Sequence, residues 1–145
     1  MLKAVASSFG PSSTAPADWA VAEFGRAQLG DARRTQRLLM IATAFAQQPT
    51  VPLPQACGPG SATQGAYRFF ENDDIDPAAL RQSHHQATLE RARHHSIVLA
   101  IQDTTTLNYS THPRTAGLGL LGSRSEKVIG LHLHCTLAVT PTGQP

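Results

Sequence analysis

A change of pattern at residue 96 constrains the fold most. Before it, apolar residues recur at the spacing of helices, and after it β-branched and apolar residues form runs of strand length. The stretch "SIVLAIQDTT", Ser96 to Thr105, places five apolar residues in six positions and then a carboxylate, Asp103. Helices followed by strands predict an α+β chain of two units, with a boundary near residue 95.

The clearest helix is expected within "LGDARRTQRLLMIATAFAQQP". Asp31 is a typical N-cap and Pro49 a typical stop. The apolar residues at helical spacing define one buried face: Leu38, Ile41, Ala42 and Phe45. Arg33 and Arg37 then lie together on an outward face, and Arg34 lies in the first turn beside the buried side.

Three more segments have helical signals. "APADWAVAEFG" offers Asp18 as N-cap, and "DIDPAALRQSHHQATLERARHH" offers Asp76, followed by a proline at the first helical position. "SATQGAYRFFEN" begins with a capping box of Ser61 and Gln64, and Gln64 and Arg68 are expected to face outward. Its expected buried residues are Ala62, Ala66, Phe69 and Phe70. The stretch "TVPLPQACGPG" is too rich in proline and glycine for regular structure.

Three strands are expected after residue 96, in "IVLAI", "TTTLNY" and "VIGLHLHCTLAV". A long Gly-rich connection, "STHPRTAGLGLLGSRSEK", separates the last strand from the others. A run as apolar as "IVLAI" is typical of a strand with both faces covered. Three strands with no following helix cannot cover both faces of a sheet, so we expect residues 96–145 to form an incomplete domain.

Composition narrows the class of protein. The chain is 41% hydrophobic, as globular proteins are, and no apolar run approaches the roughly 20 residues of a membrane-spanning helix. Residues 1–16 do not have the pattern of a signal peptide and are expected to be a flexible tail. Cys57 and Cys135 lie far apart, as expected of reduced thiols in the cytoplasm. Net charge is only +2, but residues 1–70 hold six basic and three acidic side chains.

Two interpretations of Asp103 remain open on these residues alone. A carboxylate at the end of a buried strand can accept hydrogen bonds from a turn formed with the following threonines. Alternatively, it is a metal ligand on a rigid strand, one of several carboxylates that hold two divalent ions for phosphoryl transfer.

Five stretches of the chain resemble, in order and at similar spacing, the N-terminal part of bacterial cut-and-paste DDE transposases of the transposon-five type. They are "ADWA", "LGDARRTQRL", "GAYRF", "LAIQDTTTLNY" and "LHCTLAV", and the similarity covers roughly residues 17 to 145. The resemblance implies a small helical DNA-binding domain at residues 17–95. It implies that residues 96–145 are the truncated start of an RNase-H-like, mixed α/β catalytic domain.

The resemblance gives Asp103 the place of the first of three catalytic carboxylates, and so of a ligand for Mg²⁺ or Mn²⁺ in the complete family enzyme. The family's second Asp and its Glu come later, and this chain has neither. We therefore expect the chain alone to bind no metal tightly and to catalyse no strand cleavage or transfer. The acidic residues upstream are typical of caps at a helix start: Glu71, Asp73, Asp74 and Asp76.

For DNA binding, the resemblance implies four arginine contacts and two secondary candidates: Arg33, Arg34, Arg37 and Arg68, with Gln64 and Tyr67. Helix geometry agrees for four of these, which face away from the core, although a solvated surface side chain would show the same pattern. The implied partner is double-stranded DNA at transposon ends, with no membrane partner. The implied location is the bacterial cytoplasm, with the protein on the nucleoid when it is bound to DNA.

The seven histidines do not form a familiar structural zinc motif. The adjacent pairs near residues 84 and 94 point in different directions, no HExxH occurs, and neither cysteine has a partner at ligand spacing. His132 and His134 share a strand face, and only His134 matches a position of the resembling family. A structural metal is therefore not expected.

Three hypotheses about function follow. The chain is the DNA-binding fragment of a transposase, or it is a regulatory protein that occupies transposon ends or dimerises with full-length transposase. The third hypothesis is a decayed reading frame whose product folds poorly.

Overall fold

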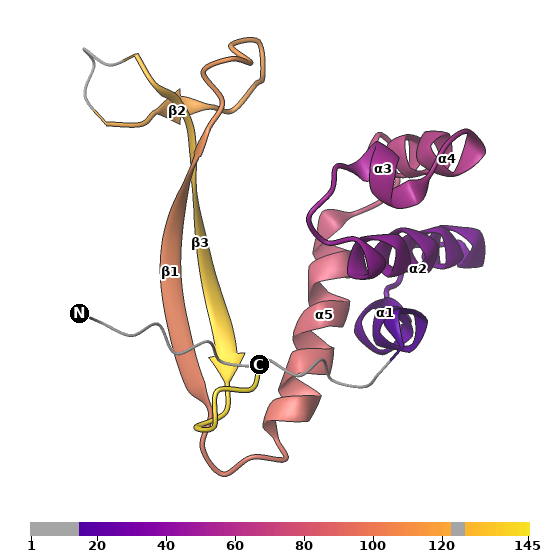
Figure 1. Ribbon diagram of the computed structural model, residues 1–145, viewed down its shortest axis with the longest axis vertical. Coiled ribbons are helices and arrows are strands. Elements are labelled where there is room, and N and C mark those ends of the chain that lie inside the picture. Colours follow the sequence, from indigo (N-terminus) through magenta and orange to yellow (C-terminus); the bar gives the residue numbers. More distant parts are fainter. Residues whose placement is uncertain (1–14, 123–126) are drawn as a thin grey trace, which may run out of the picture. The chain divides into compact units, whose positions relative to one another are not determined.

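The computed structural model describes residues 15–122 and 127–145. These residues form five helices followed by three strands, so the expected α+β class is confirmed (Figure 1). They divide into two compact units, one ending at Glu90 and the other beginning at Arg91. Residues 1–14 of the expected tail lie outside the described residues, and Pro16 of that tail begins the first helix.

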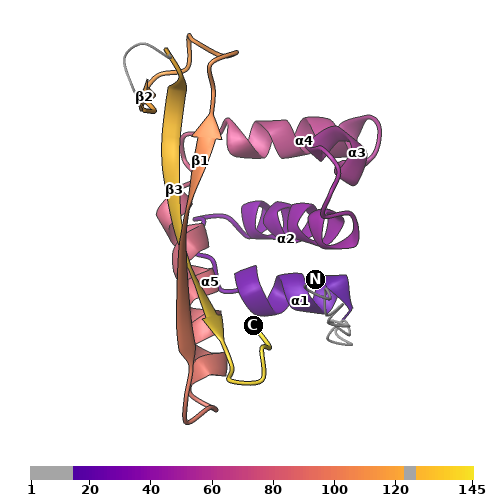
Figure 2. The same ribbon diagram turned by 60° about the vertical axis from the view of Figure 1, so that its left-hand side comes forward.

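The helical unit consists of five segments: α1 (Pro16–Phe24), α2 (Ala32–Gln47), α3 (Leu53–Cys57), α4 (Ser61–Phe70) and α5 (Pro77–Ala92). Figure 2 shows α1, α2 and α4 stacked one above another on the same side of α5. Two polar contacts join α5 to α1. The Ser83 hydroxyl donates to the Glu23 carbonyl at 2.8 Å, and His84 Nδ1 lies 2.6 Å from Glu23 Oε2.

The core of this unit lies between α2, α4 and the loop that precedes α2. Its buried residues are Ala27, Leu29, Leu38, Ile41, Ala66 and Phe69. The predicted buried face of α2 is confirmed, because Leu38, Ile41 and Ala42 are buried and Phe45 packs against the core. Burying one such large apolar side chain contributes about 1.5 to 3 kcal/mol, so this shared core holds α2 and α4 in fixed relation.

The helix caps confirm two predictions and correct two. Asp31 accepts the Arg33 amide at 2.8 Å, and Asp76 accepts the Ala78 amide at 2.8 Å. The expected cap at Asp18 is wrong, since α1 already begins at Pro16 and Asp18 lies in its first turn. The expected capping box of Ser61 and Gln64 is also wrong. Helix α4 begins at Ser61 itself, a glycine precedes it, and no side chain caps it.

Two further expectations about the helical unit are wrong. Residues Leu53–Cys57 form a short helix where the sequence predicted irregular structure. Pro52 and Pro54 stand at the cap and in the first turn, where a helix does not need their missing N–H groups. Phe70 is 57% exposed, because it is the last residue of α4 and extends beyond the core to pack edge-on against Phe69.

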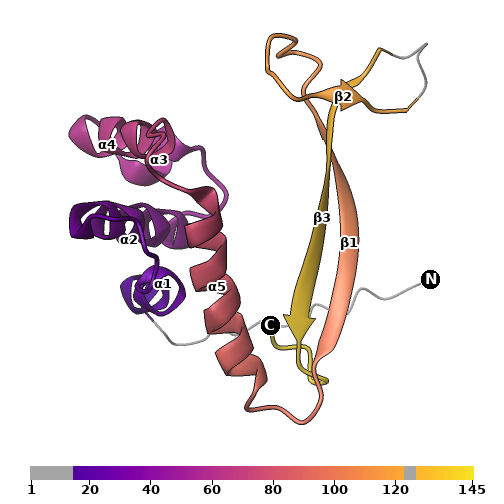
Figure 3. The ribbon, with the colours of Figure 1, turned by 180° about the vertical axis from the view of Figure 1, so that it is seen from behind.

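The second unit is an antiparallel sheet of β1 (Leu99–Asn108), β2 (Gly119–Leu120) and β3 (Ile129–Val139), in the order β1-β3-β2 (Figure 3). The strands expected in "IVLAI" and "TTTLNY" are one continuous strand, because β3 pairs with β1 along its whole length. Strand β2 lies within the expected Gly-rich connection, of which residues 123–126 lie outside the described residues.

The register of β1 and β3 sorts their side chains onto two faces, since directly opposite residues project to the same side. One face is apolar, with pairs such as Ile101 opposite Leu137. The other face is polar, with Thr104 opposite His134 and Thr106 opposite His132. Within "IVLAI", Ile101 is 52% exposed.

Candidate DNA-binding surface

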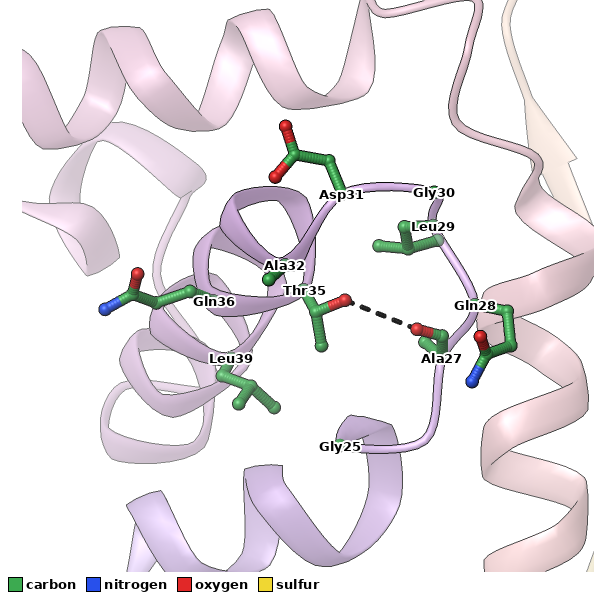
Figure 4. A pocket seen from close by; sticks show the side chains of 10 residues that line it. All are labelled: Gly25, Ala27, Gln28, Leu29, Gly30, Asp31, Ala32, Thr35, Gln36 and Leu39. Atoms are coloured by element: carbon green, nitrogen blue, oxygen red, sulfur yellow. Dashed lines mark hydrogen bonds between the residues drawn. The ribbon is translucent and has the colours of Figure 1, made fainter.

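The loop between α1 and α2 sets the position of the first turn of α2. The Thr35 hydroxyl donates to the Ala27 carbonyl at 3.3 Å (Figure 4). Arg34 Nη1 donates to the Leu29 carbonyl at 3.1 Å. Gly30 adopts a φ of 75°, which other residues rarely adopt, just before the Asp31 cap. Both ends of the loop are thus tied to α2, so the arginines of its first turns project from a braced helix end.

A pocket of about 550 Å³ lies between the end of α1 and the start of α2 (Figure 4). Its polar lining side chains include Gln28, Asp31, Thr35 and Gln36. No arginine or lysine is among the described residues that line it. Because nucleic-acid affinity comes mainly from cations placed against phosphates, this pocket is not the candidate DNA site.

Arg33 is highly exposed, with 89% of its side chain accessible. It forms an ion pair with Asp31, whose Oδ2 lies 2.9 Å from Arg33 Nη2 and 3.1 Å from Nε. Hydrogen bonds from the Arg33 side chain, and then from its amide, lower the pKa of the Asp31 carboxyl. The same contact raises the pKa of Arg33. An exposed pair of this kind is weak, so a phosphate can compete for the guanidinium.

Arg34 is held by protein acceptors. Its Nη1 donates to the Leu29 carbonyl, and its Nη2 lies 2.5 Å from Asp74 Oδ2. Only 27% of the side chain is exposed. Asp74, expected to be a residue of a helix start, instead links its segment to α2. Arg34 therefore contributes to the support of α2 more than to its outer surface.

Arg37 extends from α2 across to α4 and rests on Gly65. A Cβ atom built on Gly65 would lie 2.7 Å from Arg37 Nη1 and 2.8 Å from its Cζ, closer than such atoms approach. Arg68 stands three positions after Gly65 on α4, so the two residues share a helix face. Arg33 stands four positions before Arg37 on α2, so these two arginines also share a face. We call Arg33, Arg37 and Arg68 the arginine surface.

Gly65 lies beneath Arg37 of the arginine surface, and the sequence did not predict its role there. A glycine inside a helix lowers helix stability by roughly 1 kcal/mol relative to alanine. The presence of a glycine within α4 was therefore the one sequence signal that this position has a special role. The contact itself could not be found from spacing, because Arg37 and Gly65 lie on different helices.

Gln64 and Tyr67 line a second pocket, of about 510 Å³, at the junction of α3 and α4. Both side chains are exposed, as expected for Gln64, and 46% of Tyr67 is accessible. Since Gln64 and Arg68 are four positions apart and so are neighbours on one face of α4, this groove borders the arginine surface. The predicted DNA-contacting residues are thereby brought together on α2 and α4, with Arg34 set back from them.

Asp103 was expected at the end of a strand, but it lies in the middle of β1. The threonines after it extend the strand, since each pairs with a residue of β3. Asp103 stands opposite Cys135 and accepts a 3.4 Å hydrogen bond from Thr105 Oγ1. Within the described ranges there is no group of three or more His, Cys, Asp or Glu side chains that could hold a metal ion.

None of the helices in the described part of the chain is both long and apolar enough to cross a membrane.

A comparison with protein families concerns the helical unit. Residues 16–75 match the family model described as transposase DNA-binding. The matched range contains the arginine surface, Gly65 and the groove with Gln64 and Tyr67. The segment from residue 16 to residue 75 is therefore similar to the DNA-binding domain of transposases.

Proposed function

We propose that this protein binds double-stranded DNA at transposon ends in the course of DNA transposition, and that the arginine surface makes the principal contacts. One observation carries the proposal: Arg37 of α2 rests on Gly65 of α4 and so joins the arginines of two helices into one surface. The family match over residues 16–75 supports DNA as the partner. The resemblance to transposases of the transposon-five type supports the transposon end as the DNA.

The arginine surface is suited to phosphate contacts. Guanidinium groups bind phosphate oxygens in pairs, and neutralising phosphates supplies most of the affinity of DNA-binding proteins. The first turn of α4 adds main-chain donors, because no side chain caps that helix and its N–H groups can donate to an anion. These contacts would set the position of the domain on the duplex.

Gln64 and Tyr67 supply the groups for reading sequence. A glutamine amide can pair with the edge of adenine in the major groove, and an exposed tyrosine can pack against sugar or base. Both line the groove that borders the arginine surface. Arg34 serves the site as a positioning residue, since it already binds Leu29 and Asp74.

For residues 96–145 we propose the truncated start of an RNase-H-like catalytic domain, in which Asp103 is the first metal-binding carboxylate. The side chain is exposed on a paired strand, which suits an oxygen ligand of a hard divalent ion. A bound Mg²⁺ or Mn²⁺ would polarise a scissile phosphate. This part rests on the resemblance of "LAIQDTTTLNY". The proposed location is the bacterial cytoplasm, with the protein on the nucleoid when it is bound to DNA.

Selection from a random pool of duplexes tests the proposal and identifies the bound sequence at the same time. We expect the chain to enrich one sequence that it binds at least about 10³-fold more tightly than unselected duplex. That sequence should occur as inverted repeats beside the gene in its genome. A pool selected with the Arg33→Ala/Arg37→Ala variant serves as the control and should show no enrichment. Equal binding to all duplexes, or an enriched sequence absent from the flanking DNA, would refute recognition of transposon ends.

A further inference from the structure

The polar face of the β1–β3 ladder carries two histidines that the DNA-binding function does not use. His132 and His134 are separated by one residue on β3, so both side chains project from the same face. Both are exposed. Asp103 and Cys135 form an opposed pair on the other face of the sheet, and thus are not part of this cluster.

Each histidine is held by a threonine of β1. His134 Nδ1 lies 2.7 Å from Thr104 Oγ1, and His132 Nδ1 lies 3.2 Å from Thr106 Oγ1. Since both Nδ1 atoms are engaged in the same way, Nε2 is the nitrogen of each exposed ring that remains for a ligand. When the imidazole Nδ1 donates its proton to the threonine oxygen, Nε2 carries the lone pair that a metal ion needs.

We propose that His132 and His134 form a two-histidine site for a borderline divalent ion of the Zn²⁺, Ni²⁺ or Cu²⁺ type. Imidazole nitrogen is a preferred ligand of these ions, and an outer hydrogen bond to Nδ1 is the usual support of a metal-bound histidine. The threonine hydroxyls of β1 provide that support. Water completes the coordination, which distinguishes this open site from a structural zinc site with four protein ligands.

The site selects against the ions expected at Asp103. Mg²⁺ prefers oxygen ligands and keeps its water, so two neutral imidazoles attract it poorly. The order of affinity should follow the general series for nitrogen ligands, with Cu²⁺ tightest and Mn²⁺ weaker than Zn²⁺. The two faces of one sheet are thereby suited to different classes of ion.

Metal binding at this site should also stabilise the sheet. A bound ion fixes the tautomer in which each histidine on β3 donates to a threonine on β1. The ion therefore binds the paired strands more tightly than the unfolded chain, and mass action raises the melting temperature. This effect is independent of DNA, so the proposal stands or falls separately from the proposed function.

Calorimetric titration of the whole 145-residue chain with NiCl₂, ZnCl₂ and MgCl₂ tests the site. We expect one Ni²⁺ or Zn²⁺ per chain and no Mg²⁺. His132→Ala and His134→Ala should each abolish this binding, whereas the matched control His94→Ala/His95→Ala should retain it. The Cu²⁺ complex should show coupling to two nitrogens in its electron paramagnetic resonance spectrum, and to one nitrogen in either single variant.

A second pair of variants tests the threonine support without removing a ligand. Thr104→Val and Thr106→Val keep the side-chain shape, and each should weaken Ni²⁺ binding by about 10-fold to 100-fold. Absence of Ni²⁺ and Zn²⁺ binding by the unmodified chain would overturn the proposal. Binding of equal affinity in the His132→Ala/His134→Ala double variant would overturn it as well.

Discussion

The guanidinium of Arg37 rests directly on the backbone of Gly65, where a Cβ atom would lie 2.7 Å from Nη1. The contact joins α2 to α4 through a polar side chain and the main chain. It also explains a glycine within α4, which local helix stability alone would disfavour. A rotamer-rich side chain held in one place before binding loses less entropy when it meets a phosphate.

Substituting Gly65 should separate stability from DNA binding. In Gly65→Ala the new methyl group displaces the Arg37 guanidinium, which is the flexible end of a long side chain. We expect the melting temperature to stay the same or to rise, because alanine favours the helix by roughly 1 kcal/mol. DNA affinity should fall toward that of Arg37→Ala, as measured by fluorescence anisotropy.

A double-mutant cycle provides the control for this prediction. If Gly65 acts only by positioning Arg37, then Gly65→Ala should have little further effect on DNA affinity once Arg37 is alanine. Fully additive losses would mean that the methyl group blocks DNA directly.

Neutralising Asp31 should strengthen DNA binding. Asp31 holds the exposed guanidinium of Arg33 and places a negative charge beside the arginine surface. Asparagine is as good an N-cap as aspartate, so Asp31→Asn should release Arg33 and leave α2 intact. We expect tighter binding to duplex DNA at low salt and only a small fall in the melting temperature, because the exposed ion pair that is lost is weak.

The matched variant Asp31→Ala tests whether the cap and the charge are separable. It removes both, and loss of the cap should lower the free energy of unfolding by about 1 kcal/mol. An Asp31→Asn variant that binds DNA no better than the unmodified chain would show that the ion pair does not restrain Arg33.

The stability of the helical unit should depend on pH through Asp31. Its folded pKa is lowered, so its contribution to stability is fully present above the unfolded value of about 4 and is lost as pH falls through the folded pKa. Denaturant titrations at a series of acidic pH values should show the difference between the unmodified chain and Asp31→Asn shrinking as pH falls. A difference that does not change with pH would contradict the assigned ion pair.

Arg34 should contribute to the stability of the helical unit and not to contacts with DNA. It binds the Leu29 carbonyl and Asp74, and only 27% of its side chain is exposed. We expect Arg34→Ala to lower the free energy of unfolding by about 1 kcal/mol, after discounting for solvent at the ion pair. The salt dependence of DNA binding should stay unchanged at a temperature where the variant is folded. A flatter salt dependence would instead place Arg34 in contact with phosphate.

The sequence predicted best those features that depend on neighbours along the chain. The buried face of α2 and the caps at Asp31 and Asp76 follow from periodicity and from single residues before each helix. Helix α3 was missed because prolines usually break regular structure, although both prolines here stand where a helix tolerates them.

The errors and omissions arise from contacts between distant residues. The pairing of Arg34 with Asp74 and the contact of Arg37 with Gly65 each join separate segments, so no local pattern reports them. Asp103 was placed at a strand end because the threonines after it suggested a turn. Continuous pairing with β3 holds those threonines in the strand. Phe70 fits the apolar period of α4, but its position at the helix end leaves it exposed.

The salt dependence of DNA binding by the Arg33→Ala/Arg37→Ala variant tests the arginine surface most directly. Arg81→Ala/Arg114→Ala removes the same charge from exposed positions outside that surface, and serves as the matched control. We predict that the first variant binds duplex DNA more weakly and that its plot of log K against log salt is flatter by about 0.9 for each phosphate that is no longer neutralised. The control should retain the slope of the unmodified chain. Equal affinity and equal slope in all three proteins would show that the arginine surface does not contact DNA.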